Sequence, residues 1–232
     1  MIYIVNKKRK LENIKKDFPD ATILDITSTS NKRYAQILSP FYPHMNIPIP
    51  FTEGLTATCV EAVWQGLKVF DCADVDFVTF RNDTMKDLKR TVRKYGMPKG
   101  HRKGAYGKEL LGYFEARMLI YLPTYKWVLD NVEEVNRVVE SIKKQSKIQD
   151  IVFLDYNTNI DFRDTSNPLS HAGLVKLYIE GNYPEGLDGY EPMTKEELEE
   201  KKRQDKELRE KRKKKNKKQE PLKIPGFLDD NE

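Results

Sequence analysis

The sequence predicts a mixed α+β fold, in which one helix-rich globular domain with a small central sheet is followed by a solvated C-terminal helix and tail. Apolar runs that are typical of buried strands occur at 2–5, 21–26 and 151–154, and helical patterns separate them. After about position 190 the chain consists mainly of Lys, Glu and Arg, with too few apolar residues to bury a face. We therefore predict a globular domain over 1–190 and a charged helical to disordered tail over 191–232.

Composition favours a reduced, intracellular compartment. The formal net charge is +5, and most of the excess Lys and Arg lies in 195–218, so the charge argues only weakly for nucleic-acid binding. Cys59 and Cys72 fit neither a disulfide framework nor a zinc site, and we expect no metal. No apolar run approaches the ~18 residues of a membrane span, and no signal peptide is visible. We expect a cytoplasmic protein that does not contact membranes.

The first elements form a β-α-β unit. Strands at 2–5 and 21–26 flank a helix within 8–18, so the two strands should run parallel. The loop 27–30 is Thr-Ser-Thr-Ser, and Arg33 follows it. Because ligands sit outside the carboxyl ends of parallel strands, this loop and Arg33 are candidates to hold a phosphate. The alternative is that a Ser or Thr of the loop caps the next helix.

Residues 39–52 predict a stiff, extended loop, because prolines recur through it. Phe41 and Tyr42 lie in this loop. Their flat rings could stack on a purine or pack the loop onto the core.

Residues 58–70 predict a helix that is buried on nearly all sides. Glu61, Gln65 and Lys68 project within about 60° of one another, and apolar residues fill the opposite side. A carboxylate, an amide and an amine in one narrow strip are typical of a helix whose polar face meets a cavity. The alternative is a capping box, in which Glu61 bonds the backbone N–H of Thr58 and the other two side chains are solvated.

Two more segments combine polar groups. A basic helix is predicted over 81–93, followed by a loop at 96–104 whose glycines and basic residues, Arg102 among them, suit a pyrophosphate or a solvated loop. The turn after the strand at 151–154 contains Asn159 and Asp161, which could bind a ribose or a water. The alternative is a turn in which Asn and Asp side chains bond their own backbone.

Further helices are predicted from apolar spacing at 107–120, at 124–129 after Pro123, and at 132–147. In the tail, Thr194-x-x-Glu197 predicts a capped helix. Ile224 to Leu228 are either a docking peptide or part of a disordered end.

The spacing Glu61-x3-Gln65-x2-Lys68, followed by Phe70, resembles the signature helix of the NADAR (NAD and ADP-ribose) superfamily, although Ala62-Val63 stand where that family has His-Tyr. Upstream, Ser39–His44 and Ile47–Ile49 are similar to its Phe-Ser-Asn-Phe…Pro-Ile segment. The resemblance covers about 38–70.

This resemblance implies a NADAR-like domain and an N-glycosidase of the ADP-ribosyl-guanine glycohydrolase type. It implies Glu61 and Lys68 as catalytic residues, and Asp161 where that family has its C-terminal Asp. No cofactor is required. The partners would be an ADP-ribosyl or ribosyl-nucleotide ligand and a nucleic acid that carries the modified base. The expected substrate-binding residues are Gln65, Phe41, Tyr42, Arg33, Trp64, Arg102 and Asn159.

Two other functions fit the same residues. The pocket could bind ADP-ribose or a nucleotide without turnover. The chain could instead bind nucleic acid through the basic residues of 81–104 and its tail.

Overall fold

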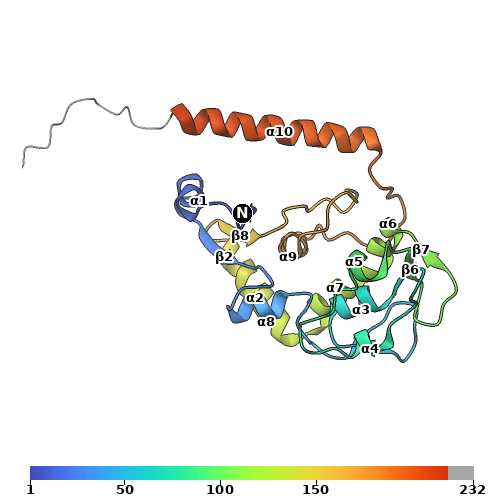
Figure 1. Cartoon of the computed structure of the whole chain (residues 1–232). Helices are drawn as coiled ribbons and strands as arrows, with labels where there is room; N and C mark the ends of the chain where they lie inside the picture. The colour runs from blue at the N-terminus through green and yellow to red at the C-terminus, as the bar shows by residue number, and fades with distance from the viewer. Residues whose placement is uncertain (219–232) are drawn as a thin grey trace, which may run out of the picture. The chain divides into compact units, whose positions relative to one another are not determined.

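The computed structural model describes residues 1–218 and has the predicted mixed α+β fold (Figure 1). The chain divides into two compact units, Met1–Pro192 and Met193–Glu232. The proposed docking peptide at 224–228 lies outside the described residues. Within residues 1–218, no helix is both long enough and apolar enough to cross a membrane.

A three-stranded parallel sheet forms one end of the first unit. Its strand order is β1 (Ile2–Asn6), β8 (Ile151–Asp155), β2 (Thr22–Asp25), and helix α1 (Leu11–Asp17) connects β1 to β2. The prediction of two parallel strands around a helix is therefore confirmed, with β8 inserted between them. All five residues of β8 are buried, as expected for a central strand with covered faces.

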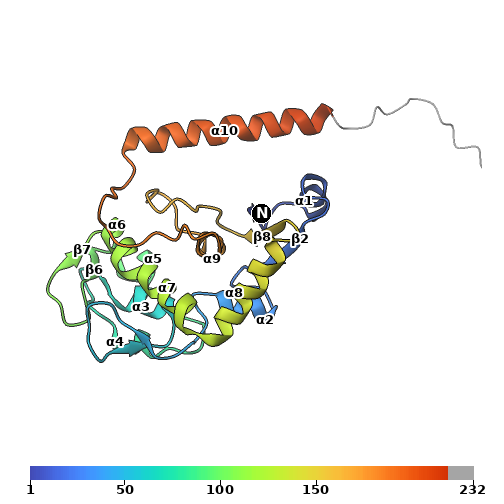
Figure 2. The same cartoon turned by 180° about the vertical axis from the view of Figure 1, so that it is seen from behind.

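Helix α9 (His171–Ile179) packs against β1 and β8 of this sheet. It also contacts α2 (Arg33–Leu38) and α8 (Glu133–Ser146), which contact each other (Figure 2). The inward residues Val135, Val139 and Ile142 of α8 are buried, as their spacing predicts.

The second part of the unit is built from short elements around α3 (Figure 1). They are β3 (Ile47–Pro48), β4 (Thr56–Ala57), α3 (Val60–Gly66), β5 (Lys68–Val69), α4 (Phe77–Phe80), α5 (Val92–Tyr95), β6 (Gly100–Arg102) and β7 (Leu110–Leu111). Strands β5, β6 and β7 form an antiparallel sheet.

The predicted helix over 81–93 is wrong. Met85 and Asp87 adopt positive φ angles of 59° and 57°, which no α-helix accommodates. The side chain of Asn82 accepts from Thr84 N and donates to the Lys86 carbonyl, so it stabilises a turn where a helix was expected. The predicted loop at 96–104 contains β6.

The predicted break between two helices at Pro123 is also wrong. One continuous helical segment runs through α6 (Tyr113–Ala116), the π-helical turn η1 (Arg117–Tyr121) and α7 (Leu122–Asn131). Pro123 has no N–H to donate, and the chain widens in the turn before it, where Leu122 N donates to the Arg117 carbonyl.

The second unit contains helix α10 (Lys195–Lys218). Thr194 N donates to the Glu197 carboxylate, and Glu197 N donates to Thr194 Oγ1, which confirms the predicted capping box.

Candidate active site

Helix α3 is buried on nearly all sides, as predicted. Six of its seven residues are buried, including Glu61 and Gln65. The helix begins after Cys59, whose Sγ accepts from Ala62 N. Thr58 Oγ1 donates to the Asn82 carbonyl and Glu61 N donates to the Pro40 carbonyl, so the alternative of a Thr58–Glu61 capping box is wrong.

The helix ends at Gly66, four residues before the predicted end at Phe70. A side chain at Gly66 would overlap the buried ring of Phe80, so only glycine fits between α3 and α4. The Arg90 guanidinium donates to the Lys68 carbonyl at 2.6 Å and to the Gln65 carbonyl at 3.4 Å. These bonds satisfy carbonyls at the end of the helix and leave Lys68 in strand β5.

Glu61, Gln65 and Lys68 nevertheless form one connected strip. Gln65 Nε2 donates to Glu61 Oε1 at 2.6 Å, and Lys68 Nζ donates to Gln65 Oε1 at 3.0 Å. Arg90 N also donates to Gln65 Oε1, at 3.1 Å, which fixes the orientation of the amide. The amide therefore connects the carboxylate to the amine.

The strip lies on the wall of a cavity of about 420 Å³, a size typical of small-molecule sites. The lining residues come from α3 and β5, from residues 28–41, from the loop between α4 and α5, from α6 and η1, and from residues 168–171. They are Ser28, Pro40, Phe41, Glu61, Trp64, Gln65, Lys68, Lys89, Tyr113, Arg117, Tyr121, Pro168, Leu169 and His171.

Burial moves the pKa values of the two ionisable groups of the strip toward each other. It raises the pKa of the Glu61 carboxyl, against the opposing effects of the Gln65 hydrogen bond and the Lys68 charge. It lowers the pKa of the Lys68 amine, against the attraction of Glu61. Opposed shifts of this kind bring the two pKa values closer together and favour proton exchange between the two groups.

Trp64 provides an aromatic wall. Its ring stacks on His101, with centroids 3.8 Å apart, and meets the edge of the Tyr121 ring at 5.5 Å. His101 is 2% exposed, and neither of its ring nitrogens has a hydrogen-bond partner among the described residues. Burial lowers the pKa of His101 to about 3, so the ring behind Trp64 is neutral.

Arg117 lines the cavity and was missed in the sequence. Its buried guanidinium donates to the carbonyls of Phe162, Asp164 and Asn167 at 2.7–2.9 Å. It therefore holds the segment before Pro168 and Leu169 against the cavity. The four-residue spacing of Tyr113, Arg117 and Tyr121 along one apolar helix was the available signal.

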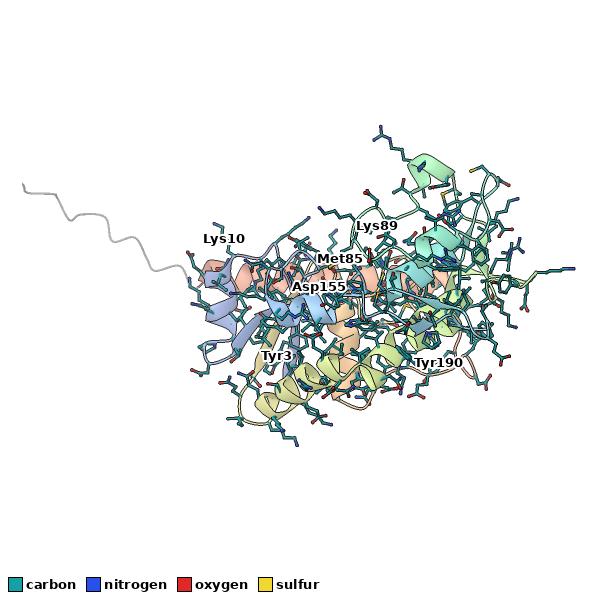
Figure 3. All side chains as sticks on the ribbon, turned by 90° about the horizontal axis from the view of Figure 1, so that it is seen from below. Tyr3, Lys10, Met85, Lys89, Asp155 and Tyr190 are labelled. Carbon is teal, nitrogen blue, oxygen red and sulfur yellow. The ribbon has the colours of Figure 1, made fainter. Side chains whose placement is uncertain are left out.

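His171 was also missed as a lining residue. Its Nε2 donates to the Ile26 carbonyl at 2.7 Å, and its Nδ1 lies 3.4 Å from Asp155 Oδ2, which also accepts from Ser170 Oγ. These contacts join the end of β8 to the start of α9 (Asp155 is labelled in Figure 3).

Three predicted binding residues, Arg33, Tyr42 and Arg102, lie outside the cavity lining. Arg33 donates to Glu134 Oε1 and lies over the ring of Tyr42, at 5.1 Å from its centroid. Arg102 donates to both carboxylate oxygens of Asp74. The expected anion site at the 96–104 loop is not part of this cavity, because β6 pairs with β5 and β7 and fixes Arg102 beside Asp74. Of the hydroxyls at 27–30, that of Ser30 accepts from Lys32 N at 3.3 Å just before α2, but no side chain caps the helix itself.

Asn159 and Asp161 also lie outside the lining. Asn159 Oδ1 accepts from Asp161 N, and Asp161 Oδ1 accepts from Arg163 N. The same pattern joins Asn157 to Asn159 N and Asp164 to Ser166 N. This is the series of side-chain-to-backbone turns that formed the alternative interpretation.

The comparisons with known proteins give one family. A family model described as "Family of unknown function (DUF6939)" matches residues 6–175. No curated protein and no solved structure matches the chain. All residues that line the cavity fall within the matched range. Because the match covers more than half of the sequence, the chain belongs to the family of unknown function DUF6939.

Proposed function

We propose that this protein is an N-glycosidase that removes ADP-ribose, or a related ribosyl group, from a base. The observation that carries the proposal is the Glu61–Gln65–Lys68 strip, buried on the wall of a cavity of about 420 Å³. The resemblance of 38–70 to the NADAR signature supports the same chemistry, because Glu61, Gln65 and Lys68 are the residues that carry it.

Cleavage of an N-glycosidic bond builds positive charge on the ribose C1′ and negative charge on the departing base. A carboxylate beside C1′ stabilises the first of these charges. Glu61 is suited to this role, because it is buried and its remaining neighbours on the strip are an amide and an amine. Gln65 holds the two reactive groups at a fixed separation.

Lys68 is the proposed nucleophile. Its lowered pKa increases the fraction of neutral amine, and the amine lone pair forms a bond to C1′ as the bond from C1′ to the base nitrogen breaks. The base leaves with the bonding electrons and takes a proton from solvent water. Glu61 accepts a proton from the attached nitrogen and returns it to the ring oxygen as the ribose opens to a Schiff base. Water then hydrolyses the Schiff base and regenerates the lysine.

The rest of the lining supports a ribosyl-nucleotide ligand. The rings of Phe41 and Trp64 offer flat apolar faces to a base. Two cationic side chains besides the proposed nucleophile, from Lys89 and Arg117, line the cavity with one carboxylate, that of Glu61, so an anionic ligand is favoured.

The test is release of guanine from ADP-ribosylated guanosine, measured by chromatography. Glu61→Gln and Lys68→Met should each lower kcat/KM at least about 100-fold, the scale of a lost general acid–base or nucleophilic group. Borohydride added during turnover should attach the sugar to wild-type Lys68 and not to Lys68→Arg. Lys99→Met, on an exposed lysine that pairs with Asp71, is the matched control and should keep full activity.

Two results would reject the proposal. Turnover that survives Lys68→Met would remove the lysine from the chemistry. Binding of ADP-ribose by the wild type, without any release of guanine, would indicate a non-catalytic binding module.

A further inference from the structure

Lys89 lines the solvent end of the cavity. Its side chain is exposed, whereas Glu61 and Gln65 are buried at the inner wall. Tyr113 and Pro168 are the other exposed residues of the lining, so these three mark the mouth. Lys89 and Met85 belong to the loop between α4 and α5, and both are labelled in Figure 3.

The backbone on both sides of Lys89 is anchored. Leu88 is 1% exposed and belongs to the main core. Arg90 is 6% exposed, and its guanidinium donates to the carbonyls of Lys68 and Asp74. Because Arg90 N donates to Gln65 Oε1, the position of Lys89 is tied directly to the polar strip.

The ammonium of Lys89 has neither an ion pair nor a hydrogen bond within residues 1–218. It lies over the ring of Phe41, with Nζ 5.5 Å from the ring centroid, and its charge also acts on the Glu61 carboxyl. By contrast, Lys103 pairs with Glu109 and Arg102 with Asp74. Lys89 therefore offers a cation at the cavity mouth that the fold has not already neutralised.

We propose that Lys89 and Phe41 form the subsite for the phosphate-bearing part of the ligand, with the phosphate paired to the ammonium and the adjoining planar group on the ring. This rests on the proposed function and narrows its substrate class to phosphorylated ribosyl compounds. An ammonium is a good point-charge partner for phosphate, and an aromatic face accepts any base. The subsite takes the role that the sequence suggested for Arg33 and Arg102.

Calorimetric titration of the full chain with ADP-ribose and with adenosine tests this inference. Wild type should bind ADP-ribose at least about tenfold more tightly than adenosine. Lys89→Gln should weaken ADP-ribose binding at least about tenfold and change adenosine binding less than about twofold, since one charge-assisted contact is lost. Lys89→Arg should stay within about threefold of the wild type. Lys86→Gln, on an exposed lysine of the same loop outside the lining, should match the wild type.

The outcomes separate this inference from the proposed function. Equal binding of ADP-ribose by Lys89→Gln and the wild type would overturn the subsite even if the wild type releases guanine. Equal wild-type affinity for adenosine and ADP-ribose, or no binding of either, would overturn it as well. If Lys89→Gln loses the preference for ADP-ribose over adenosine, but the wild type never releases guanine, the subsite stands and the glycosidase is rejected.

Discussion

Two sets of carboxylate and amide side chains in this protein make opposite kinds of contact. On α3 and β5, the side chains of Glu61, Gln65 and Lys68 bond to one another and face a cavity. In the turn at 157–166, Asn and Asp side chains accept from backbone N–H groups two residues further on. The comparison teaches that carboxylate and amide side chains can line a cavity only where the local backbone does not need them. A turn without regular structure needs them, whereas the interior of a helix does not.

The largest expected effect comes from removing Arg117, whose side chain joins the turn at 157–166 to the wall of the cavity. Arg117→Met leaves the carbonyls of Phe162, Asp164 and Asn167 without their charged donor, and we expect a loss of about 3 kcal/mol in the free energy of unfolding. Urea denaturation measures this loss. The exposed Arg137→Met, which removes an i,i+4 ion pair with Glu133, should leave the free energy of unfolding nearly unchanged. If the two variants lost equal stability, Arg117 would not be what holds the turn.

The fold could be predicted from the sequence where local patterns decide it. The apolar runs at 2–5, 21–26 and 151–154 predicted the strands of the sheet, although only the central strand β8 is buried along its whole length. The narrow polar arc at Glu61, Gln65 and Lys68 predicted the strip.

The remaining parts of the cavity depend on contacts between distant segments. Arg117 and His171 reach the cavity only because the π-helical turn and the start of α9 are brought against α3 and β2. Lys89 was placed on a helix, since the spacing of Met85 and Leu88 is helical. The hydrogen bonds of Asn82 and the positive φ angle at Asp87 decide otherwise. The positive φ angle at Met85 could not be predicted, because non-glycine residues other than Asn and Asp rarely adopt such angles.

Two glycines, Gly66 in α3 and Gly173 beside the turn at 157–166, allow a second comparison of the two regions, with a smaller expected effect on stability. Gly66 lies in α3 against Phe80, which is 1% exposed, and Gly66→Ala should destabilise the protein by about 2 kcal/mol, because a buried ring cannot move aside. At Gly173, an added Cβ would meet Ile160 Cγ2 at 2.5 Å, but Ile160 is 38% exposed and can rotate away. Gly173→Ala should therefore change the free energy of unfolding by less than about 1 kcal/mol, since alanine also favours the helix. A larger loss at Gly173 than at Gly66 would show that the turn is the more rigidly packed region.

The smallest expected effect is the loss in the free energy of unfolding that comes from burying the Glu61 carboxyl. Burial raises the pKa of Glu61 above its ordinary value of 4.5, so the folded state binds more protons than the unfolded state between the two values. The contribution of this group is fully present below pH 4.5 and is lost as pH rises through the folded-state pKa. Gln at position 61 does not titrate.

Glu61→Gln should therefore gain stability relative to the wild type as pH rises from 4 to 7, although the proposed function requires it to lose activity. Burial lowers the pKa of Lys68 below 10.5, so the wild type gains stability as pH rises toward that value. Any gain in stability of Lys68→Met over the wild type should therefore shrink at alkaline pH, which is the opposite trend. Urea denaturation at several pH values measures both trends. Glu61→Gln that is less stable than the wild type at pH 7 would mean that the carboxylate is held by its partners more strongly than burial opposes it, and the strip would then be a structural ion-pair network with no need of a substrate.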